Sequence, residues 1–285
     1  MSQQTPVRAG TQESRHRQYT FASRMAKTPK SFIREILKVT ENPRIISFAG
    51  GLPNPGLIDV EGVTRAAQTV LGQDGRVALQ YSTTEGYLPL RQFIADRYKK
   101  RLGLTVSPDE ILITNGSQQC LDLIGKILIN AGDHVAIEKP GYLGAIQAFS
   151  LYEPQFHPVL LQEYGLDPVQ FADTLAKYPI RLFYGVPDSQ NPSGVTYTTS
   201  NRKEIASLLE GKETLLVADD AYGELTFDGT SLPSFREFLP DQTILTGSFS
   251  KILAPGMRMG WVVAPPAIME QLIITKQASD LHSNY

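Results

Sequence analysis

A single lysine stands at the end of a predicted buried strand, among side chains that suit a phosphate. Lys251 follows the apolar run 243–246, with Ser248 and Ser250 just before it and Arg258 seven residues after it. Because burial and a nearby cation lower the pKa of an amine, Lys251 is expected to attack a carbonyl and form a Schiff base. Serine hydroxyls and an arginine are donors for a phosphate. A Schiff-base lysine beside a phosphate site is what pyridoxal phosphate requires; a solvated lysine beside ordinary turn serines is the alternative.

Two further predicted strands end in groups that fit the phosphate and the ring of this cofactor. Ser117 and Gln118 follow the run 111–114 and open a helix, whose N-terminal N–H groups favour an anion. Simple N-capping by Ser117 is the alternative. Tyr142 follows the run 135–138, where it can stack on a flat heteroaromatic ring or pack as an ordinary aromatic residue.

The next two strand ends supply groups for the polar atoms of the ring. Asn191 follows the run 182–186 and precedes a proline, which holds it extended so that its amide can donate to a phenolate. Asp219 follows the run 215–218 and can pair with a protonated ring nitrogen, which keeps the ring able to accept electrons. Tyr222, three residues later, can reach the same phenolate. The competing interpretation is a metal-binding acidic pair, but no histidine or further carboxylate cluster follows nearby in the sequence.

Two loops in the first third of the chain contain further candidates. Gly51 belongs to a Gly-Gly turn that lets the backbone approach a ligand closely, although a plain tight turn fits the same residues. Tyr81 lies in a polar loop among serine and threonine residues, where its hydroxyl can contact a phosphate. An ordinary surface tyrosine is the alternative there.

Apolar runs of strand length alternate with helical periodicity over most of the chain. The alternation predicts an α/β fold with a mostly parallel sheet and helices on both faces. Such sheets bind ligands at the carboxyl ends of their strands, where the candidate residues lie. The predicted strands are 111–114, 135–138, 155–161, 182–186, 215–218, 243–246 and 261–264. The predicted helices are 88–102, 118–130, 144–151, 168–177, 200–209 and 267–278.

The composition is ordinary for a globular protein. The 285 residues are 41% hydrophobic with a formal net charge of −2, so neither nucleic acid nor an anionic membrane is an expected partner. The single cysteine, Cys120, excludes an internal disulfide framework and fits a reducing compartment. No apolar run approaches the roughly 20 residues that cross a bilayer, and the polar N-terminus lacks the apolar core of a secretory signal. The cytoplasm is the expected location.

The sequence around these candidates resembles a known family. The motifs are NPSG at 191–194, DDAY at 219–222, SFSK at 248–251 and PGMR at 255–258. They resemble those of the fold-type I pyridoxal-phosphate aminotransferases of class I/II. Three further motifs resemble those of the branch of 2-aminoadipate, kynurenine and aromatic or branched-chain aminotransferases: SFAGGLP at 47–53, QYSTTEG at 80–86 and TNGSQQ at 114–119. The resemblance runs from about Arg24 to the last residue.

The resemblance implies a role for each matching position. Lys251 would hold the cofactor as a Schiff base and, once freed, carry the proton between the substrate Cα and the cofactor C4′. Asp219 would pair with the ring nitrogen, and Tyr142 would stack on the ring. Asn191 and Tyr222 would hold the phenolate oxygen. The phosphate would be held by Ser117, Gln118, Ser248, Ser250 and Arg258.

The resemblance also implies a partner subunit and substrate contacts. Tyr81 would reach the cofactor phosphate of the neighbouring subunit, so the active unit is expected to be a homodimer. Arg24 is the expected contact for a substrate side-chain carboxylate, with Gly51 and Asn191 as the other substrate-binding positions.

The implied domain organisation places the cofactor site in the larger part of the chain. Residues 1–50 would form an N-terminal arm and part of a small domain, and residues 51–285 the large cofactor-binding domain. Family members continue beyond the point where this chain ends. That continuation forms most of the small domain and supplies the arginine for the substrate α-carboxylate, so a C-terminally truncated chain that lacks the small domain is expected.

The expected activity is transfer of an amino group from an L-amino acid to a 2-oxo acid such as 2-oxoglutarate by a ping-pong route. The expected donor is of the 2-aminoadipate, aromatic or branched-chain type. Other pyridoxal-phosphate chemistry, such as β-elimination or decarboxylation, and a cofactor-binding fragment without turnover are the alternatives. The effector-sensing domain of a transcription regulator is a further alternative, which a leader too short for a DNA-binding domain disfavours.

Overall fold

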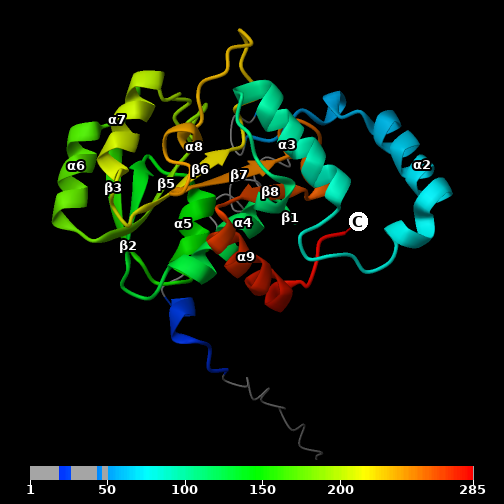
Figure 1. The fold of residues 1–285 in the computed structure, drawn as a ribbon, viewed down its shortest axis with the longest axis horizontal. Helices are drawn as coiled ribbons and strands as arrows, with labels where there is room; N and C mark the ends of the chain where they lie inside the picture. The colour runs from blue at the N-terminus through cyan, green and yellow to red at the C-terminus, as the bar shows by residue number, and fades with distance from the viewer. Residues whose placement is uncertain (1–18, 27–43, 47–50, 285) are drawn as a thin grey trace, which may run out of the picture.

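The computed structural model describes residues 19–26, 44–46 and 51–284 of the chain. Its strands are β1 (Ile111–Thr114), β2 (His134–Lys139), β3 (Gln155–Gln162), β4 (Gly165–Leu166), β5 (Ile180–Gly185), β6 (Leu215–Asp220), β7 (Thr243–Ser248) and β8 (Gly260–Val263). They form one sheet with the order β1-β8-β7-β6-β5-β2-β3-β4 (Figure 1).

The strand directions confirm the predicted, mostly parallel sheet. The strands β3, β2, β5, β6 and β7 pair with one another in parallel. The strand β8 lies antiparallel between β7 and β1, and the two-residue β4 is antiparallel to β3. Helices occupy the crossovers between the parallel strands, as parallel pairing requires.

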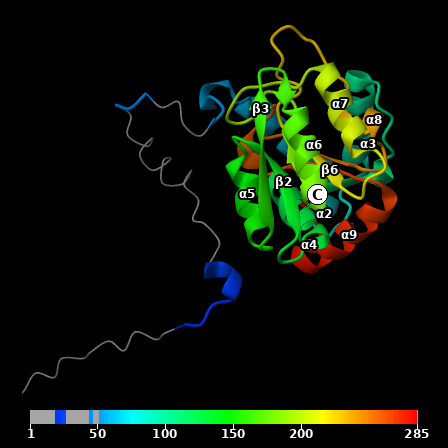
Figure 2. The same cartoon turned by 90° about the vertical axis from the view of Figure 1, so that its left-hand side faces the viewer.

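Helices cover both faces of the sheet, also as predicted. The helices are α2 (Val60–Ala78), α3 (Leu88–Leu102), α4 (Ser117–Leu128), α5 (Leu143–Ser150), α6 (Pro168–Lys177), α7 (Thr199–Leu209), α8 (Phe235–Phe238) and α9 (Pro266–Ser279). Short 3₁₀ turns are η1 (Ser23–Ala26), η2 (Pro55–Leu57), η3 (Pro108–Glu110) and η4 (Pro255–Met257). One hydrophobic cluster gathers side chains from α3, α6, α7 and α8, and the other from α4, α5 and α9. Figure 2 shows β2 and β3 between α5 on one side and α6 on the other.

The strand β6 shows why continuous apolar runs located the strands. Leu216 and Ala218 join one hydrophobic cluster, and Val217 joins the other. Because successive side chains of a strand point to opposite faces, a strand covered on both sides is apolar throughout. The strand predicted at 111–114 and the helices predicted at 88–102 and 168–177 coincide with β1, α3 and α6. The other predicted strands and helices listed above differ from the observed ones by one or a few residues at their ends.

The helix α2 is not among the predicted helices. It begins after Asp59, whose carboxylate accepts a hydrogen bond of 2.8 Å from the N–H of Gly62, and apolar residues recur along it at helical spacing. No residue of α2 is buried, and Figure 1 shows the helix apart from the sheet, beyond α3. Among the described residues, no other helix or strand packs closely against it, and several of its apolar side chains are exposed.

The predicted domain boundary at residue 50 stays a prediction, because most of residues 1–50 lie outside the described residues. The described part of the chain that follows, 51–284, contains the whole sheet. Across the described ranges, no helix combines the length and apolarity needed to span a membrane.

Candidate active site

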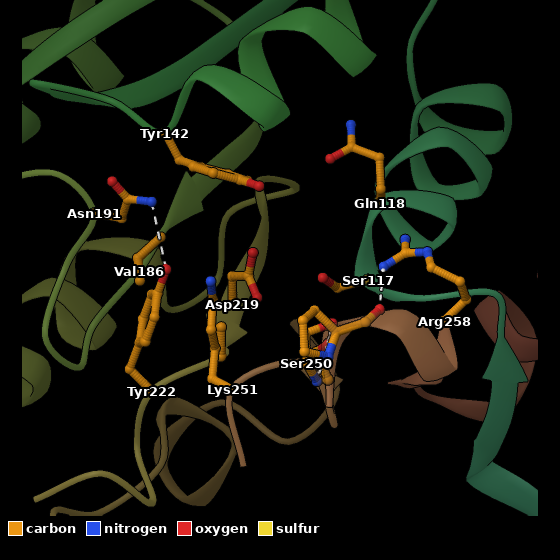
Figure 3. A pocket seen from close by; sticks show the side chains of 13 residues that line it. Ser117, Gln118, Tyr142, Val186, Asn191, Asp219, Tyr222, Ser250, Lys251 and Arg258 are labelled. Atoms are coloured by element: carbon orange, nitrogen blue, oxygen red, sulfur yellow. Dashed lines mark hydrogen bonds between the residues drawn. The ribbon is translucent and has the colours of Figure 1, made fainter. Parts of the chain in front are cut away.

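A cavity of about 500 Å³ lies at the carboxyl ends of the parallel strands (Figure 3). Its walls include every residue predicted to contact the cofactor except Tyr81. The lining residues are Ser117, Gln118, Tyr142, Val186, Asn191, Asp219, Ala221, Tyr222, Ser248, Ser250, Lys251, Pro255 and Arg258. They meet there because neighbouring parallel strands end at one edge of the sheet, so segments far apart in sequence converge.

Lys251 lies in the turn that follows β7, and its amine extends into the cavity (Figure 3). Its Nζ donates a hydrogen bond of 2.8 Å to the carbonyl oxygen of Gly51, whose φ of 55° is left-handed. Burial lowers the pKa of Lys251. The expected second cause, a neighbouring cation, is not found among the described residues: Arg258 lies beyond Ser250 in Figure 3.

Asp219 presents a buried carboxylate with one oxygen left open. The residue is 4% exposed, and its Oδ2 accepts a hydrogen bond of 2.7 Å from the hydroxyl of Tyr184. Its Oδ1 is buried and has no hydrogen-bond partner among the described residues. Burial raises the pKa of Asp219, and the side chains of Tyr184 and Thr246 oppose that rise. A buried acceptor without a donor costs free energy of folding. A ligand with a hydrogen-bond donor beside this carboxylate would offset that cost.

Tyr142, Asn191 and Tyr222 enclose one side of the cavity (Figure 3). The Asn191 amide donates to the hydroxyl of Tyr222 at 3.4 Å. Burial raises the pKa of Tyr222, so its hydroxyl keeps its proton and can donate. A Cβ on Gly144 would lie 2.6 Å from the Tyr142 ring, so the close approach of this ring to α5 requires a glycine.

Hydroxyl and N–H groups line the opposite end of the cavity. The hydroxyl of Ser248 donates to the hydroxyl of Ser250 at 2.9 Å, and the Ser250 N–H donates to the Ser248 oxygen at 3.0 Å. Ser117 is the first residue of α4, and Gln118 follows it. The first N–H groups of a helix lack partners within the helix and favour an anion. These groups together suit a phosphate.

Arg258 reaches the same end across a glycine. Its Nη2 donates to the carbonyl oxygen of Asn115 at 3.4 Å and its Nη1 to that of Pro255 at 3.3 Å. A Cβ on Gly116 would lie 2.5 Å from Nη2, and the φ of Gly116 is 81°. The backbone conformation of Gly116 therefore favours glycine, and a side chain at this position would displace the Arg258 guanidinium from its present place.

Glu138 supports the cavity from behind and was not singled out as a functional residue by its sequence context. Its Oε1 accepts hydrogen bonds from the Val186 N–H at 2.8 Å and the Tyr197 hydroxyl at 2.6 Å. Its Oε2 accepts from the Gln190 amide at 2.8 Å. Burial raises the pKa of Glu138 to about 7. Since Val186 lines the cavity and Gln190 precedes Asn191, this carboxyl group fixes the segment that carries the predicted phenolate donor.

Two predicted residues lie away from the cavity. Arg24, in η1, lies close enough to Tyr152 to lower the pKa of that hydroxyl, against the larger effect of burial, which raises it. Tyr81 is 80% exposed, and its ring meets the edge of His282 with 5.3 Å between ring centroids. The substrate contact predicted for Arg24 and the phosphate contact predicted for Tyr81 in a neighbouring subunit stay predictions.

The two carboxylates of the acidic pair point to different partners. Asp219 faces the cavity, whereas Asp220 pairs with Arg101 and accepts a hydrogen bond from the N–H of Gly223 at 3.1 Å. Burial raises the pKa of Asp220 to about 6, and Arg101 opposes the rise. Within the described ranges, no group of three or more histidine, cysteine, aspartate or glutamate side chains could hold a metal ion. The geometry therefore gives the competing metal interpretation no support.

The groups around the cavity fit pyridoxal phosphate. An unpartnered carboxylate oxygen matches a protonated ring nitrogen, paired donors match a phenolate, and an amine of lowered pKa matches the aldehyde. The fold and the cavity thus define an α/β protein with a lysine-centred site for this kind of cofactor. The sequence model of the family "Aminotransferase class I and II" matches residues 49–281, and the chain belongs to this family.

Relatives in this family include proteins named for specific aminotransferase activities. The 2-aminoadipate transaminase of Thermus thermophilus is 44% identical over 257 residues, which are 89% of this chain and 63% of that protein. Aromatic-amino-acid aminotransferase 1 of Thermococcus litoralis is 39% identical over 260 residues, 89% of this chain and 62% of that protein. The chain thus spans less than two thirds of the length of these curated relatives.

A solved structure shows the same fold. The α-aminoadipate aminotransferase LysN from Thermus thermophilus, complexed with N-(5′-phosphopyridoxyl)-L-leucine, matches with a TM-score of 0.85 and 41% sequence identity. The match covers 93% of this chain and 66% of that one.

Proposed function

We propose that this chain binds pyridoxal phosphate in the cavity and attaches it to Lys251. The observation that carries the proposal is the open Oδ1 atom of Asp219, a buried acceptor in a cavity that also contains an amine and phosphate donors. A protonated pyridine nitrogen would satisfy this atom. The relative whose solved structure contains a phosphopyridoxyl group supports the choice of cofactor.

The residues of the cavity would bind and orient this cofactor and move one proton. When bound, pyridoxal phosphate supplies a sink for the electrons released at the substrate Cα. Asp219 would hold the ring nitrogen protonated, and Tyr142 would stack on the ring. Because burial lowers its pKa, the amine of Lys251 would be neutral for more of the time and able to accept a proton from the substrate Cα. The phosphate would be held by Ser117, Gln118, Ser248, Ser250 and Arg258.

We further propose that the reaction is transfer of an amino group from an L-amino acid to a 2-oxo acid such as 2-oxoglutarate. The donor would be of the 2-aminoadipate, aromatic or branched-chain type. The support is the family and the two relatives named for 2-aminoadipate and for aromatic amino acids. Gly51 and Asn191 would meet the substrate at the cavity, since the Gly51 carbonyl already bonds to Lys251. Arg24 would reach a substrate carboxylate from the N-terminal arm.

A donor screen tests this activity. The protein with pyridoxal phosphate is mixed with each amino acid, with and without 2-oxoglutarate, and the 2-oxo product is measured. Product in excess over the enzyme-bound cofactor that forms only with 2-oxoglutarate supports transamination, because the first half-reaction alone releases only a stoichiometric amount. Continued formation of the 2-oxo product without it assigns β-elimination instead, and release of carbon dioxide with the corresponding amine assigns decarboxylation. A cofactor spectrum without any product assigns a binding fragment.

The active unit is proposed to be a homodimer in the cytoplasm. The helix α2 and the segment after it expose apolar side chains: Val70 is 46% exposed, Leu71 55% and Leu79 80%. Apolar surface of this kind is characteristic of a protein interface, and the exposed ring of Tyr81 lies beside it in sequence. Sedimentation equilibrium tests the proposal: the chain should be dimeric, and Leu71→Glu should shift it toward monomer. A wild-type chain that is monomeric at micromolar concentration contradicts it.

A further inference from the structure

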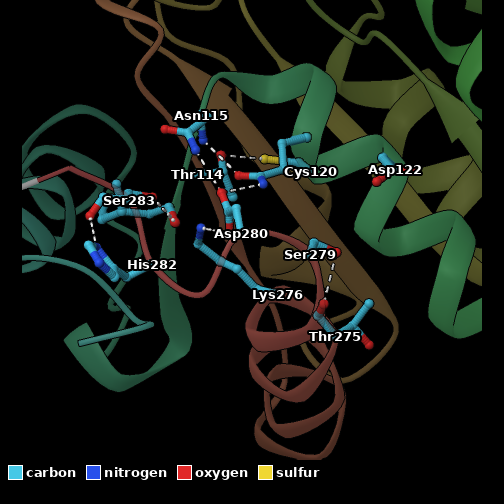
Figure 4. Close-up of polar contacts among 12 residues, drawn as sticks. Thr114, Asn115, Cys120, Asp122, Thr275, Lys276, Ser279, Asp280, His282 and Ser283 are labelled. Atoms are coloured by element: carbon cyan, nitrogen blue, oxygen red, sulfur yellow. Dashed lines mark hydrogen bonds and ion pairs between the residues drawn. The ribbon is translucent and has the colours of Figure 1, made fainter. Parts of the chain in front are cut away.

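The carboxylate of Asp280, just after α9, lies against the turn that begins α4 (Figure 4). Its Oδ2 accepts two hydrogen bonds of 2.7 Å, one from the Asn115 side-chain amide and one from the Gln119 side-chain amide. Its Oδ1 accepts from the amine of Lys276 at 2.6 Å. One carboxylate therefore joins the end of α9 to both ends of the segment 115–119.

The ion pair holds Asp280 in place. Lys276 is fully buried, at 0% exposure, and Asp280 lies one helical turn further along the chain. A buried ammonium group is strongly destabilising without a paired charge, so Asp280 is held close to Lys276. Ser283 makes a second contact between the segment after α9 and the sheet: its hydroxyl donates a hydrogen bond of 3.1 Å to the carbonyl oxygen of Ile113 in β1.

The two amides that Asp280 binds flank the phosphate end of the cavity. Ser117 and Gln118, which line the cavity, lie between Asn115 and Gln119. The Gln119 Oε1 accepts the Asn115 N–H at 2.8 Å, which closes the turn on itself. The carbonyl of Asn115 also accepts the bond from Arg258. A change at Asp280 would thus reach three of the predicted phosphate donors through two side chains.

We propose that Asp280 is a positioning residue for the phosphate of the cofactor. It acts by fixing Asn115 and Gln119, and so the N–H groups at the start of α4, without touching the ligand. The inference rests on the proposed binding of pyridoxal phosphate. It goes beyond that function by assigning phosphate affinity to a contact outside the cavity.

The test compares two ligands that differ only in the phosphate. Dissociation constants for pyridoxal phosphate and for pyridoxal are measured on the cofactor-free protein by visible absorbance, for the wild type and for Asp280→Asn. The variant places an amide against Lys276 and weakens the charged hydrogen bonds to Asn115 and Gln119, so affinity for pyridoxal phosphate should fall about tenfold. Affinity for pyridoxal should stay at the wild-type value, because pyridoxal makes no use of the phosphate donors.

Two further variants complete the design. Lys126→Ala removes another contact between α4 and α9, the bond of 3.0 Å from Lys126 Nζ to Ser279 Oγ, and should leave both affinities unchanged. Gln119→Met removes the amide while keeping the pair of Lys276 and Asp280. It should repeat the selective loss, and it decides the question if Asp280→Asn does not fold, as judged by circular dichroism.

The outcomes separate the inference from the function on which it rests. A selective loss for pyridoxal phosphate supports the positioning role. An equal loss for both ligands, or no loss for either, overturns it while leaving the proposed function intact. A wild-type protein that binds neither ligand overturns the proposed function and the inference together.

Discussion

The hydroxyl of Tyr184 donates a hydrogen bond of 2.7 Å to Oδ2 of Asp219, while Oδ1 of the same carboxylate has no partner among the described residues. The bond opposes the rise in the pKa of Asp219 that burial causes. Tyr184 lies in β5 and Asp219 in the neighbouring β6. The pairing of these two central strands therefore brings the Tyr184 hydroxyl to the Asp219 carboxylate.

Removing the Tyr184 hydroxyl should destabilise the fold and weaken cofactor binding. Tyr184→Phe leaves a second oxygen of Asp219 buried without a donor, which costs about 1–3 kcal/mol in the free energy of unfolding. The pKa of Asp219 should rise further, so less of the carboxylate is ionised and the dissociation constant for pyridoxal phosphate should increase. Urea unfolding and absorbance titration measure the two effects. Tyr164→Phe, at an exposed tyrosine, serves as the control, and a Tyr184→Phe protein as stable as this control would contradict the account.

Glu138 should give the stability of the protein a specific pH dependence. Its pKa in the folded protein, about 7, lies above the ordinary value of 4.5, so the folded state holds the proton more tightly than the unfolded state. The stability that this proton contributes is full below about pH 4.5 and is lost as the pH rises to about 7, on the order of 3 kcal/mol in all.

The variant Glu138→Gln cannot titrate and isolates this contribution. The free energy of unfolding of both proteins is measured with urea from pH 4.5 to 8. The wild type should lose stability relative to the variant between pH 4.5 and about 7, and the difference between the two proteins should then stay constant up to pH 8. A difference that does not change with pH would show that burial of Glu138 does not raise its pKa.

Gly116 should matter for cofactor binding because a side chain at this position would displace the guanidinium of Arg258, in addition to straining the backbone. Gly116→Ala places a Cβ 2.5 Å from the Arg258 guanidinium at a φ of 81°. The control is Gly103→Ala, where φ is also positive, at 67°, and nothing lies within 4 Å of the new Cβ. Gly103→Ala should lose roughly 1–2 kcal/mol of stability from its left-handed backbone. Gly116→Ala should lose more, because its φ of 81° and ψ of 162° lie in a region that essentially only glycine adopts. Only Gly116→Ala should also bind pyridoxal phosphate more weakly by absorbance titration; equal affinity in the two variants would contradict the role of Arg258.

The convergence of the predicted residues that line the cavity could be read from the sequence, because each lies after an apolar run that ends at the same edge of the sheet. The residues that support the cavity from outside its lining, Tyr184 and Glu138, could not be identified from the sequence. Tyr184 lies inside an apolar run and is indistinguishable there from a core aromatic, since its partner Asp219 is 35 positions away. Glu138 likewise depends on Gln190, 52 positions away, for one of its hydrogen bonds. Such pairings follow from the order of the strands, which local patterns do not determine.

The helix α2 illustrates a different reason. Its apolar residues recur at helical spacing after the N-cap Asp59, so a local signal was present. No residue of the helix is buried by the described part of the chain, so the packing that would normally confirm such a local signal is not seen there. Local patterns predict helices most securely where the chain itself provides the surface that covers them.

The attachment of the cofactor to Lys251 is the central claim, and its most direct test is the visible spectrum of the protein with pyridoxal phosphate. The wild type should develop the absorbance of a lysine-bound cofactor, which borohydride should fix covalently at Lys251, as peptide mass mapping can show. The variant Lys251→Ala should show the spectrum of free pyridoxal phosphate and no covalent label in the cavity. An unchanged bound spectrum in Lys251→Ala, or a label placed by mapping on another lysine, would contradict the account.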